Sequence, residues 1–367
     1  MPDLAFVNVR KKFGTVVALK DLDLHVADGE YAVVLGSTGA GKTTLLRVAA
    51  GILEPDAGEV QIDGNTVNHV PPEDREVGYF PQGYALFPHM TVQQNVEYGL
   101  RARGERRKEA SERALEILQL VGLARRAQSL PSELSGGMQQ RVALARAIAP
   151  GFKILLLDEP LGALDAILRI ELRHELRLLA RRLGATVLHV THDQEEALFL
   201  ADKLVVMRKG VIMQVGDPRE VYDRPDSIFV GNFVGEMNFL EGIVTAGANG
   251  SSVFESKALA LTLPDGEWVE GRQVVLAVRP EDVRLGLTDR HGENVLRARV
   301  VSTTFSGGVY RVRALLPGDR GLTAKTPHVP GFKAPGPDEE VDVQLHPSEL
   351  LVYPYPPQGL LKALEYE

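Results

Sequence analysis

The nine residues GSTGAGKTT, from Gly36 to Thr44, restrict the possible folds of this chain more than any other stretch. They follow YAVVL at 31–35, a run typical of a buried strand, and they lead into the helix-like segment KTTLLRVAA. Repeated glycines let backbone N–H groups surround an anion, and a helix N-terminus adds positive potential. Lys42 can then reach nucleotide phosphates, and the Thr43 hydroxyl can bind Mg²⁺. A glycine-rich turn that only opens a helix is the alternative, but the flanking strand and helix favour a phosphate-binding loop.

Two adjacent acids follow a second apolar run, ILLLD at 154–158. Asp158 suits a Mg²⁺ ion that is held by few protein ligands. The side chain of Glu159 projects differently, so it can polarise an attacking water as a general base. The alternative is that Asp158 and Glu159 are solvated acids at an ordinary strand end. The phosphate-binding loop upstream makes this alternative much weaker.

Up to about Gly235, short apolar runs alternate with helical segments. Besides the two runs above, the predicted strands are 77–80, 186–190 and 203–207. The predicted helices are 42–50, 111–122, 142–149, 165–183 and 193–201. Such alternation predicts an α/β fold with a mostly parallel sheet flanked by helices.

After Gly235 the pattern changes to short β-rich runs separated by glycine and proline. The runs are 239–246, 274–278, 295–305, 308–316, 341–345 and 349–353. They predict a small all-β barrel or sandwich, while 360–367 fits a short helix or a frayed end. We therefore expect two domains, 1–235 and 236–367.

The composition restricts which binding partners and which cellular compartment we expect for this chain. With 41 basic and 49 acidic residues, the net charge of −8 gives no support for a nucleic-acid partner. The chain has no cysteine, which excludes disulfides and cysteine metal sites. It also shows no signal peptide and no uncharged apolar run of about 18 residues, so we expect a cytoplasmic protein that can still dock on a membrane protein.

The stretch LSGGMQQR at 134–141 opens a helix with a serine and two glycines. Glycine is a poor helix former, whereas an open helix N-terminus is an anion site. Because one phosphate-binding loop is already present, we expect Ser135 and Gly137 to contact the γ-phosphate of a nucleotide held by a second copy. Two molecules would then pack head to tail around ATP, and hydrolysis would release them.

The segment LSGGMQQRVALARAI closely resembles the signature of ABC-type ATPases, and further segments occur in that family's order. VGYFPQG, with Gln82, resembles the Q-loop, and LGALDA, with Asp165, resembles the D-loop. VTHDQEEAL, with His192, resembles the switch-histidine segment. KKFG, with Phe13, resembles the segment whose aromatic ring stacks on adenine. The resemblance extends from about residue 5 to residue 240.

This resemblance implies a role for each matched residue. Glu159 would be the catalytic base, His192 would hold the γ-phosphate, and Gln82 would sense Mg²⁺ and water. Lys42 would assist at the phosphates, and Asp165 would bridge the two sites of a dimer. The residues implied to bind ATP are Phe13, Gly36, Ser37, Thr38, Gly39, Ala40, Gly41, Lys42, Thr43, Thr44, Ser135, Gly136, Gly137 and Asp165. Those implied to hold Mg²⁺ are Thr43, Gln82 and Asp158.

Other segments resemble one subgroup, the ATP-hydrolysing subunits of importers for sugars, sulfate, molybdate, ferric iron or polyamines. These segments are YALFPHMTVQQNVEYGL, PPEDREVGYFPQ, VGDPREVY, FVGEMNFL and LAVRPEDVRL. The resemblance implies a P-loop NTPase of the ABC type, with an antiparallel β subdomain, a helical subdomain at about 88–150 and a C-terminal OB-like domain that often regulates. It also implies a homodimer at the cytoplasmic face of the cell membrane, with two membrane-spanning permease subunits and, indirectly, an extracytoplasmic solute-binding protein.

The solute stays open, although STTFSGGVYRVRALL slightly favours an inorganic ion or a polyamine over a sugar. The main alternative function is a soluble ABC ATPase that acts on nucleic acid or the ribosome. Such chains usually carry coiled-coil insertions or two cassettes, and neither is visible here. A small-molecule kinase is a second alternative, but it would not need LSGGM. Met138 departs from the usual polar residue after SGG, and His189 is expected to belong to the core.

Overall fold

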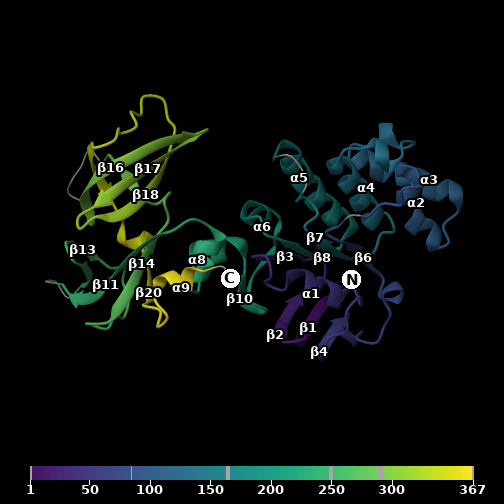
Figure 1. The fold of residues 1–367 in the computed structure, drawn as a ribbon, viewed down its shortest axis with the longest axis horizontal. Coiled ribbons are helices and arrows are strands. Elements are labelled where there is room, and N and C mark those ends of the chain that lie inside the picture. The colour runs from purple at the N-terminus through teal and green to yellow at the C-terminus, as the bar shows by residue number, and fades with distance from the viewer. Residues whose placement is uncertain (1, 84, 163–165, 248–250, 287–291, 366–367) are drawn as a thin grey trace. The chain divides into compact units, whose positions relative to one another are not determined.

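The computed structural model describes residues 2–365, except for 84, 163–165, 248–250 and 287–291. The chain forms two compact units (Figure 1). The first ends at Asp223, and the second is Arg224–Glu365. Each unit has its own hydrophobic core and is described separately.

A six-stranded sheet forms the centre of the first unit, in the order β10-β9-β3-β8-β7-β6. The strands are β3 (Tyr31–Gly36), β6 (Val77–Phe80), β7 (Ile154–Asp158), β8 (Thr186–Thr191), β9 (Lys203–Arg208) and β10 (Val211–Gly216). Every neighbouring pair is parallel except β9 and β10. Strands β3, β7 and β8 are buried along their whole length, as expected for strands covered on both faces. The predicted mostly parallel sheet is thereby confirmed.

The parallel register brings three strand ends to one edge of this sheet. Leu35 of β3 lies opposite Thr191 of β8, and Asp158 of β7 lies opposite Val190. The residues that follow these strands are therefore neighbours, although they are far apart in the sequence.

A second, antiparallel sheet in the order β2-β1-β4-β5 packs against the same core. Its strands are β1 (Leu4–Phe13), β2 (Val16–Val26), β4 (Ala57–Ile62) and β5 (Asn65–Thr66). Helix α1 (Lys42–Ala49) contributes the fully buried Leu45 and Leu46 to the core that both sheets share. The remaining helices of the parallel sheet are α5 (Ala166–Leu183), α6 (Gln194–Leu200) and α7 (Pro218–Asp223).

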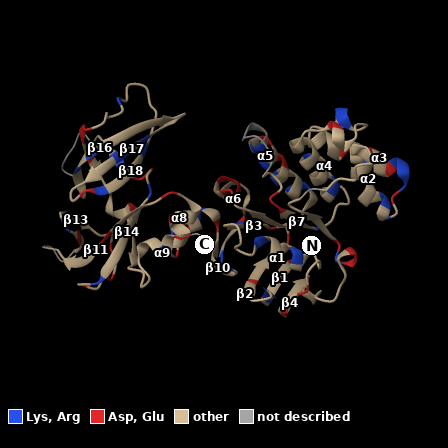
Figure 2. Ribbon diagram, viewed as in Figure 1, with Lys and Arg blue, Asp and Glu red and all other residues tan. Residues whose placement is uncertain are grey.

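Three helices form a separate cluster within the first unit. They are α2 (Val92–Ala102), α3 (Arg107–Leu120) and α4 (Gly136–Ile148). Their buried side chains, among them Val96, Leu118 and Val142, make a core of their own. Figure 2 shows a group of basic residues around α3, and Lys108 there is almost fully exposed, so this basic face is solvated.

Two antiparallel five-stranded sheets form the second unit, in the orders β13-β12-β11-β14-β20 and β15-β19-β16-β17-β18. The first sheet contains β11 (Asn238–Ala246), β12 (Ser252–Ser256), β13 (Leu259–Thr262), β14 (Gln273–Val278) and β20 (Leu351–Pro354). The second contains β15 (Arg284–Leu285), β16 (Val295–Ser306), β17 (Val309–Leu316), β18 (Arg320–Pro327) and β19 (Glu340–Gln344). One core joins residues of both sheets, including Phe254, Leu276 and Leu322, which confirms the predicted all-β architecture.

The division between the units comes earlier in the chain than the expected boundary at 235 and 236. Helix α8 (Ile228–Val234) precedes that boundary but belongs to the second unit. Its Ile228 packs in a cluster with Val275 and Tyr353, and the Tyr353 hydroxyl donates a hydrogen bond to the Pro225 carbonyl at 2.9 Å. Composition alone groups this helix with the α/β part, whereas its contacts tie it to strands β14 and β20. The short helix α9 (Leu360–Leu364) packs in the same cluster.

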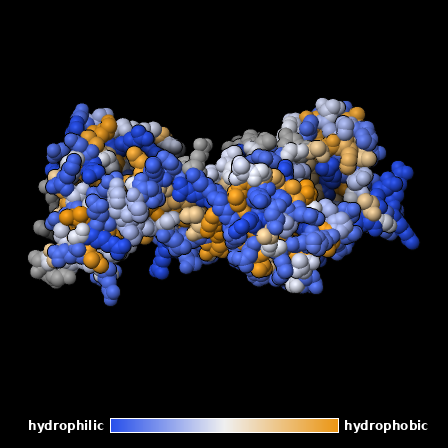
Figure 3. Space-filling model, turned by 60° about the horizontal axis from the view of Figure 1, so that its bottom comes forward, coloured by the Kyte–Doolittle hydropathy of each residue, from blue (hydrophilic) through white to orange (hydrophobic). Residues whose placement is uncertain are grey.

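The surface seen in Figure 3 is mainly hydrophilic, with hydrophobic residues in separate groups. Within the described residues, no helix is both long and apolar enough to cross a membrane.

Candidate active site

The phosphate-binding loop joins β3 to α1, as the sequence predicts. Gly41 has φ of 104°, and a Cβ there would lie 2.5 Å from the Ala18 carbonyl oxygen, so no other residue fits. At Gly36, a Cβ would lie 2.7 Å from the Met207 carbonyl oxygen. Because Gly41 is the N-cap of α1 and provides no side-chain acceptor, the first N–H groups of this helix stay available to an anion.

Lys42 is held inside this loop. Its Nζ donates to the carbonyl oxygens of Gly36 at 2.7 Å and Ser37 at 2.9 Å. Burial lowers the pKa of Lys42, while the carboxylates of Glu159 and Asp158 act in the opposite direction. Lys42 is only 7% exposed, so its ammonium group lies inside the loop and not in solvent.

Asp158 lies directly beneath the loop at the end of β7 and is 1% exposed. Its Oδ1 accepts a hydrogen bond from Thr43 Oγ1 at 3.2 Å. Its Oδ2 is buried without a hydrogen-bond partner among the described residues. Burial raises the pKa of this carboxyl. A buried carboxylate oxygen without a partner, next to a hydroxyl, fits the oxygen ligands that Mg²⁺ prefers.

Glu159 turns the chain away from β7, because its φ of 49° is in the left-handed region that non-glycine residues rarely adopt. Its N–H donates to the Val190 carbonyl at 3.0 Å, and Gln140 Nε2 donates to its carbonyl oxygen at 3.3 Å. These contacts hold the unusual backbone in place. Asp158 and Glu159 therefore present their carboxylates to different partners, as the sequence predicts.

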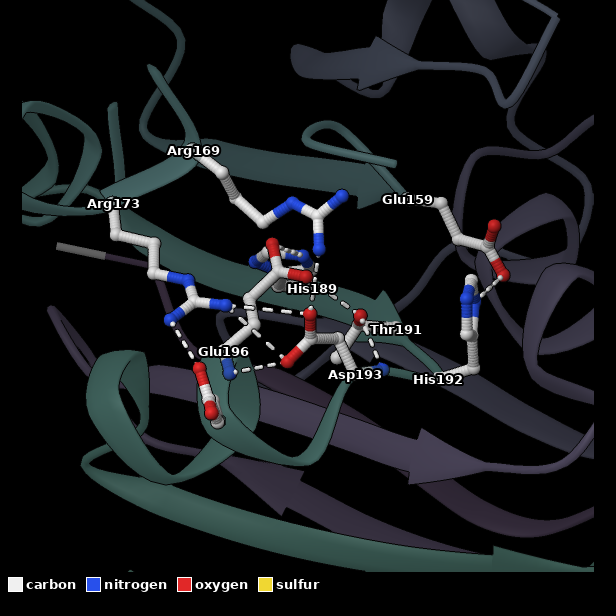
Figure 4. A network of polar contacts seen from close by, with 9 residues as sticks. Glu159, Arg169, Arg173, His189, Thr191, His192, Asp193 and Glu196 are labelled. Atoms are coloured by element: carbon white, nitrogen blue, oxygen red, sulfur yellow. Dashed lines mark hydrogen bonds and ion pairs between the residues drawn. The ribbon is translucent and has the colours of Figure 1, made fainter. Parts of the chain in front are cut away.

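The carboxylate of Glu159 lies between two other predicted site residues. Gln82 Nε2 donates to Oε2 at 3.2 Å. His192 Nδ1 is 3.0 Å from Oε1, as Figure 4 shows. Gln82 follows β6 and His192 follows β8, so three neighbouring strand ends supply this group. The structure thus brings together Gln82, Glu159 and His192.

A cavity of about 400 Å³ lies beside the phosphate-binding loop and beside Gln82 and Glu159. Its lining includes the loop from Thr38 to Thr44, together with Gln82, Glu159 and Phe13. Phe13 is 48% exposed, and Lys11 Nζ lies over its ring at 5.8 Å from the centroid. Lys20 and Lys209 also line the cavity, although the sequence analysis does not single them out. Neither follows a recognisable motif, and they reach the cavity only through the fold.

The segment 135–137 is not in the lining of this cavity. Ser135 caps α4, accepting a hydrogen bond from the Met138 N–H at 3.4 Å, and both Ser135 and Gly136 are exposed. The predicted helix is longer than expected, since it begins at Gly136 and includes both glycines. Asp165 lies outside the described residues.

Comparison with known proteins identifies both units. A family model described as ABC transporter matches residues 19–162, and a TOBE domain model matches 276–352. The chain is 43% identical to a sulfate/thiosulfate import ATP-binding protein of Chromobacterium violaceum, over 94% of this chain and 93% of that protein. It is 44% identical to a trehalose/maltose import ATP-binding protein of Thermococcus litoralis, over 82% of this chain and 84% of that protein.

A solved structure also resembles the first unit. It is a dimeric ATP-binding cassette in a post-hydrolysis state, bound to ADP and Pi. It is 33% identical, with a TM-score of 0.55, and the match covers 59% of this chain and 99% of that one. The chain therefore belongs to the ABC transporter family of ATPases, with a TOBE domain in its second unit.

Proposed function

We propose that this chain is the ATP-binding and ATP-hydrolysing subunit of a binding-protein-dependent importer, and that it works as a dimer. The observation that carries this proposal is the Glu159 carboxylate, held between Gln82 and His192 beside the cavity that the phosphate-binding loop lines. That arrangement suits attack by water on a terminal phosphate, because a base stands next to the place where the phosphates would lie.

In this proposal, ATP enters the cavity with its phosphates at the loop from Gly36 to Thr44. Lys42 exchanges its two loop carbonyl partners for phosphate oxygens, and the first N–H groups of α1 add further contacts. The exposed ring of Phe13 stacks on adenine.

Thr43, Asp158 and Gln82 would hold Mg²⁺, since the first two already meet and Asp158 has an oxygen without a partner. When bound, Mg²⁺ neutralises charge that develops on the phosphates. The residues of this chain then need only to position the nucleotide and the water.

Glu159 accepts a proton from the attacking water. His192 keeps one ring nitrogen on Glu159, which leaves the other for the γ-phosphate. Gln82 donates to the second carboxylate oxygen and so fixes the plane of the base.

A second copy of the chain would complete the site. Ser135 and Gly136 are exposed and Gly137 is half-buried at the start of α4, and all three are absent from the lining of their own cavity, so they are available to the other protomer's γ-phosphate. The dimeric cassette that this chain resembles supports the same assembly. Asp165 would bridge the two sites, and hydrolysis would release the pair.

Two membrane-spanning permease subunits would dock on the first unit at the cytoplasmic face of the membrane, and an extracytoplasmic solute-binding protein would act through them. The proposed docking surface is the loop before α2. There the ring of Phe87 packs on Tyr98 at 4.7 Å, Arg146 lies over Phe87 at 5.1 Å, and Tyr98 is 49% exposed. Such an aromatic group with a cationic rim is typical of protein interfaces.

The solute is set by partners that this chain does not contain. Relatives named for sulfate/thiosulfate and for trehalose/maltose import are 43% and 44% identical, so identity favours neither. The slight preference for an inorganic ion or a polyamine stays a prediction from the sequence. The importer names of the relatives favour transport over an action on nucleic acid or the ribosome.

Phosphate release by the full chain with Mg²⁺ and ATP tests the chemistry. Glu159→Gln removes the base but keeps the size and the hydrogen-bonding oxygen, so we expect kcat to fall about 100- to 1000-fold while ATP still binds. Glu109→Gln, on the exposed face of α3, is the matched control and should hydrolyse ATP as the native chain does. Equal rates for Glu159→Gln and the native chain would contradict the assignment of the base.

A further inference from the structure

The side chain of His192 is poorly held by its own contacts. It is 60% exposed, and among the described residues its one polar contact is Glu159 at 3.0 Å. A side chain with so little support can occupy several rotamers. Its position must therefore depend on the backbone that carries it.

That backbone is fixed on both sides of His192 by a ring of hydrogen bonds (Figure 4). The Thr191 hydroxyl donates to Glu196 Oε2 at 2.7 Å and accepts from the Asp193 N–H at 3.0 Å. The Glu196 N–H donates to Asp193 Oδ1 at 2.9 Å, which caps α6. The side chain of His192 takes no part in these bonds, and it contacts Glu159 instead.

Glu196 is an unusual anchor for a turn, because its carboxylate is buried and only 2% of the residue is exposed. Its Oε1 lies 3.2 Å from His189 Nε2, and His189 Nδ1 lies 3.0 Å from the Tyr31 hydroxyl. Burial acts to raise the pKa of Glu196, but His189 and the Thr191 hydroxyl outweigh it and hold the pKa below its usual range. The acceptor for Thr191 therefore stays ionised inside the core.

Asp193 is fixed from the other side by helix α5. Its Oδ2 is 3.1 Å from Arg169 Nη1 and 3.3 Å from Arg173 Nη2. Arg173 is buried, so this contact is screened little by solvent. The turn that carries His192 is consequently bound to the core at Thr191 and to α5 at Asp193.

We propose that Thr191 and Glu196 are positioning residues for His192: their buried hydrogen bond sets the turn so that the histidine meets Glu159 and the γ-phosphate. This inference rests on the role of His192 proposed above. It adds that the rate of hydrolysis depends on a hydroxyl that touches neither nucleotide nor water.

A role in stability alone is the competing explanation, and the same strand offers a matched control. Thr186, at the opposite end of β8, is also fully buried, and its hydroxyl also makes two hydrogen bonds. It donates to the Pro2 carbonyl at 2.8 Å and accepts from the Gly29 N–H at 3.0 Å. Thr186→Val and Thr191→Val therefore remove equivalent groups, but only the second acts next to His192.

The experiment compares kcat and KM for ATP in the full chain carrying Thr191→Val, Thr191→Ser or Thr186→Val. We expect Thr191→Val to lower kcat about 10- to 100-fold, the cost of misplacing one catalytic group, with KM changed less than about twofold. Thr191→Ser keeps the hydroxyl and should restore the rate. Thr186→Val should keep the native kcat, whatever its effect on the melting temperature.

Equal loss of kcat in the two valine variants, or a raised KM with unchanged kcat in Thr191→Val, would overturn the inference. If Thr191→Val does not fold, it is combined with Glu196→Gln, because a neutral amide tolerates a lost partner better than a buried carboxylate does. The same comparison then applies to the double variant, with Glu196→Gln alone as its reference.

His192→Ala separates this inference from the proposed function. If His192→Ala itself leaves kcat unchanged, the proposed role of the histidine fails. If His192→Ala lowers kcat and Thr191→Val does not, the histidine acts without help from Thr191 and only the positioning role fails.

Discussion

Two helices of the first unit have a glycine at their start, as the N-cap of α1 and as the first residue of α4, yet their N-termini are built differently. Helix α1 follows Gly41, has no side-chain cap, and opens into a cavity beside Lys42 and Asp158. Helix α4 begins at Gly136, is capped by Ser135, and is exposed at the surface. The first N-terminus has a cation and an acid beside it, whereas the second is capped by the hydroxyl of Ser135.

This difference indicates that the N-termini of α1 and α4 have different roles. The α1 end can hold a nucleotide by itself, because it supplies donors, a lysine and a metal-binding acid. The α4 end has too few groups to hold one, so it is suited to a phosphate that another protomer presents. Four substitutions test this difference between the two helix ends.

The largest effect is expected from Lys42→Ala. Removing the buried cation from the α1 end should lower kcat about 1000-fold, because Lys42 is the cation held inside the loop where the phosphates are proposed to bind. Phosphate release by the full chain is the measurement. Lys108→Ala, on the solvated face of α3, is the control, and a loss of less than tenfold in Lys42→Ala would show that the α1 end is not the phosphate site.

A smaller loss is expected from Ser135→Arg, at the α4 end. A bulky side chain there should lower kcat about 100-fold by blocking the contact with the second copy. The Kd for ATP, measured on dilute protein, should change less than about twofold, because Ser135 does not line the cavity. A strongly weakened Kd would mean that both helix ends act on one chain's own nucleotide.

Phe13→Ala tests the part of the cavity where adenine is proposed to bind. Losing one stacking ring should raise the Kd for ATP about tenfold and leave kcat at saturating ATP unchanged. Phe13→Tyr keeps the ring and is the control. An unchanged Kd in Phe13→Ala would assign the ring to packing only.

The smallest effect concerns the free energy of unfolding. Because burial raises the pKa of Asp158, the folded state binds a proton more tightly than the unfolded state, and stability falls as pH rises through that raised pKa. Asp158→Asn removes this penalty and should stabilise the chain by about 1 kcal/mol at neutral pH.

Urea denaturation without Mg²⁺ at several pH values measures this difference. The gap between Asp158→Asn and the native chain should open above about pH 4 and stop growing once the pH exceeds the raised pKa. If the native chain instead became more stable relative to Asp158→Asn as the pH rises, burial would not be raising the pKa of Asp158. The same variant should hydrolyse ATP poorly.

Local sequence patterns predict the parallel sheet and the residues at its edge. The apolar runs before Gly36, Glu159 and His192 define strands β3, β7 and β8, and parallel pairing alone then brings these residues together. Helix α2 also has a local signal, because Thr91 and Gln94 form a capping box at its start.

Other features have no local signal. Strand β1 pairs with β2 through several register shifts, so no regular alternation marks it. Tyr31 and His189 meet across two strands that are far apart in the chain, and His189, expected only to fill the core, proves to be part of a polar chain. The left-handed backbone of Glu159 depends on contacts with Val190 and Gln140 that only the fold provides.

The mass of the Glu159→Gln chain in solution, with and without Mg²⁺ and ATP, shows whether the α4 end completes the nucleotide site of another protomer. We expect ATP to convert the monomer into a stable dimer, because binding is intact and the hydrolysis that would release the pair is blocked. Adding Ser135→Arg should abolish that dimer without abolishing ATP binding. A chain that binds ATP and stays monomeric, or a dimer that Ser135→Arg leaves intact, would contradict the claim that the α4 end completes another protomer's site.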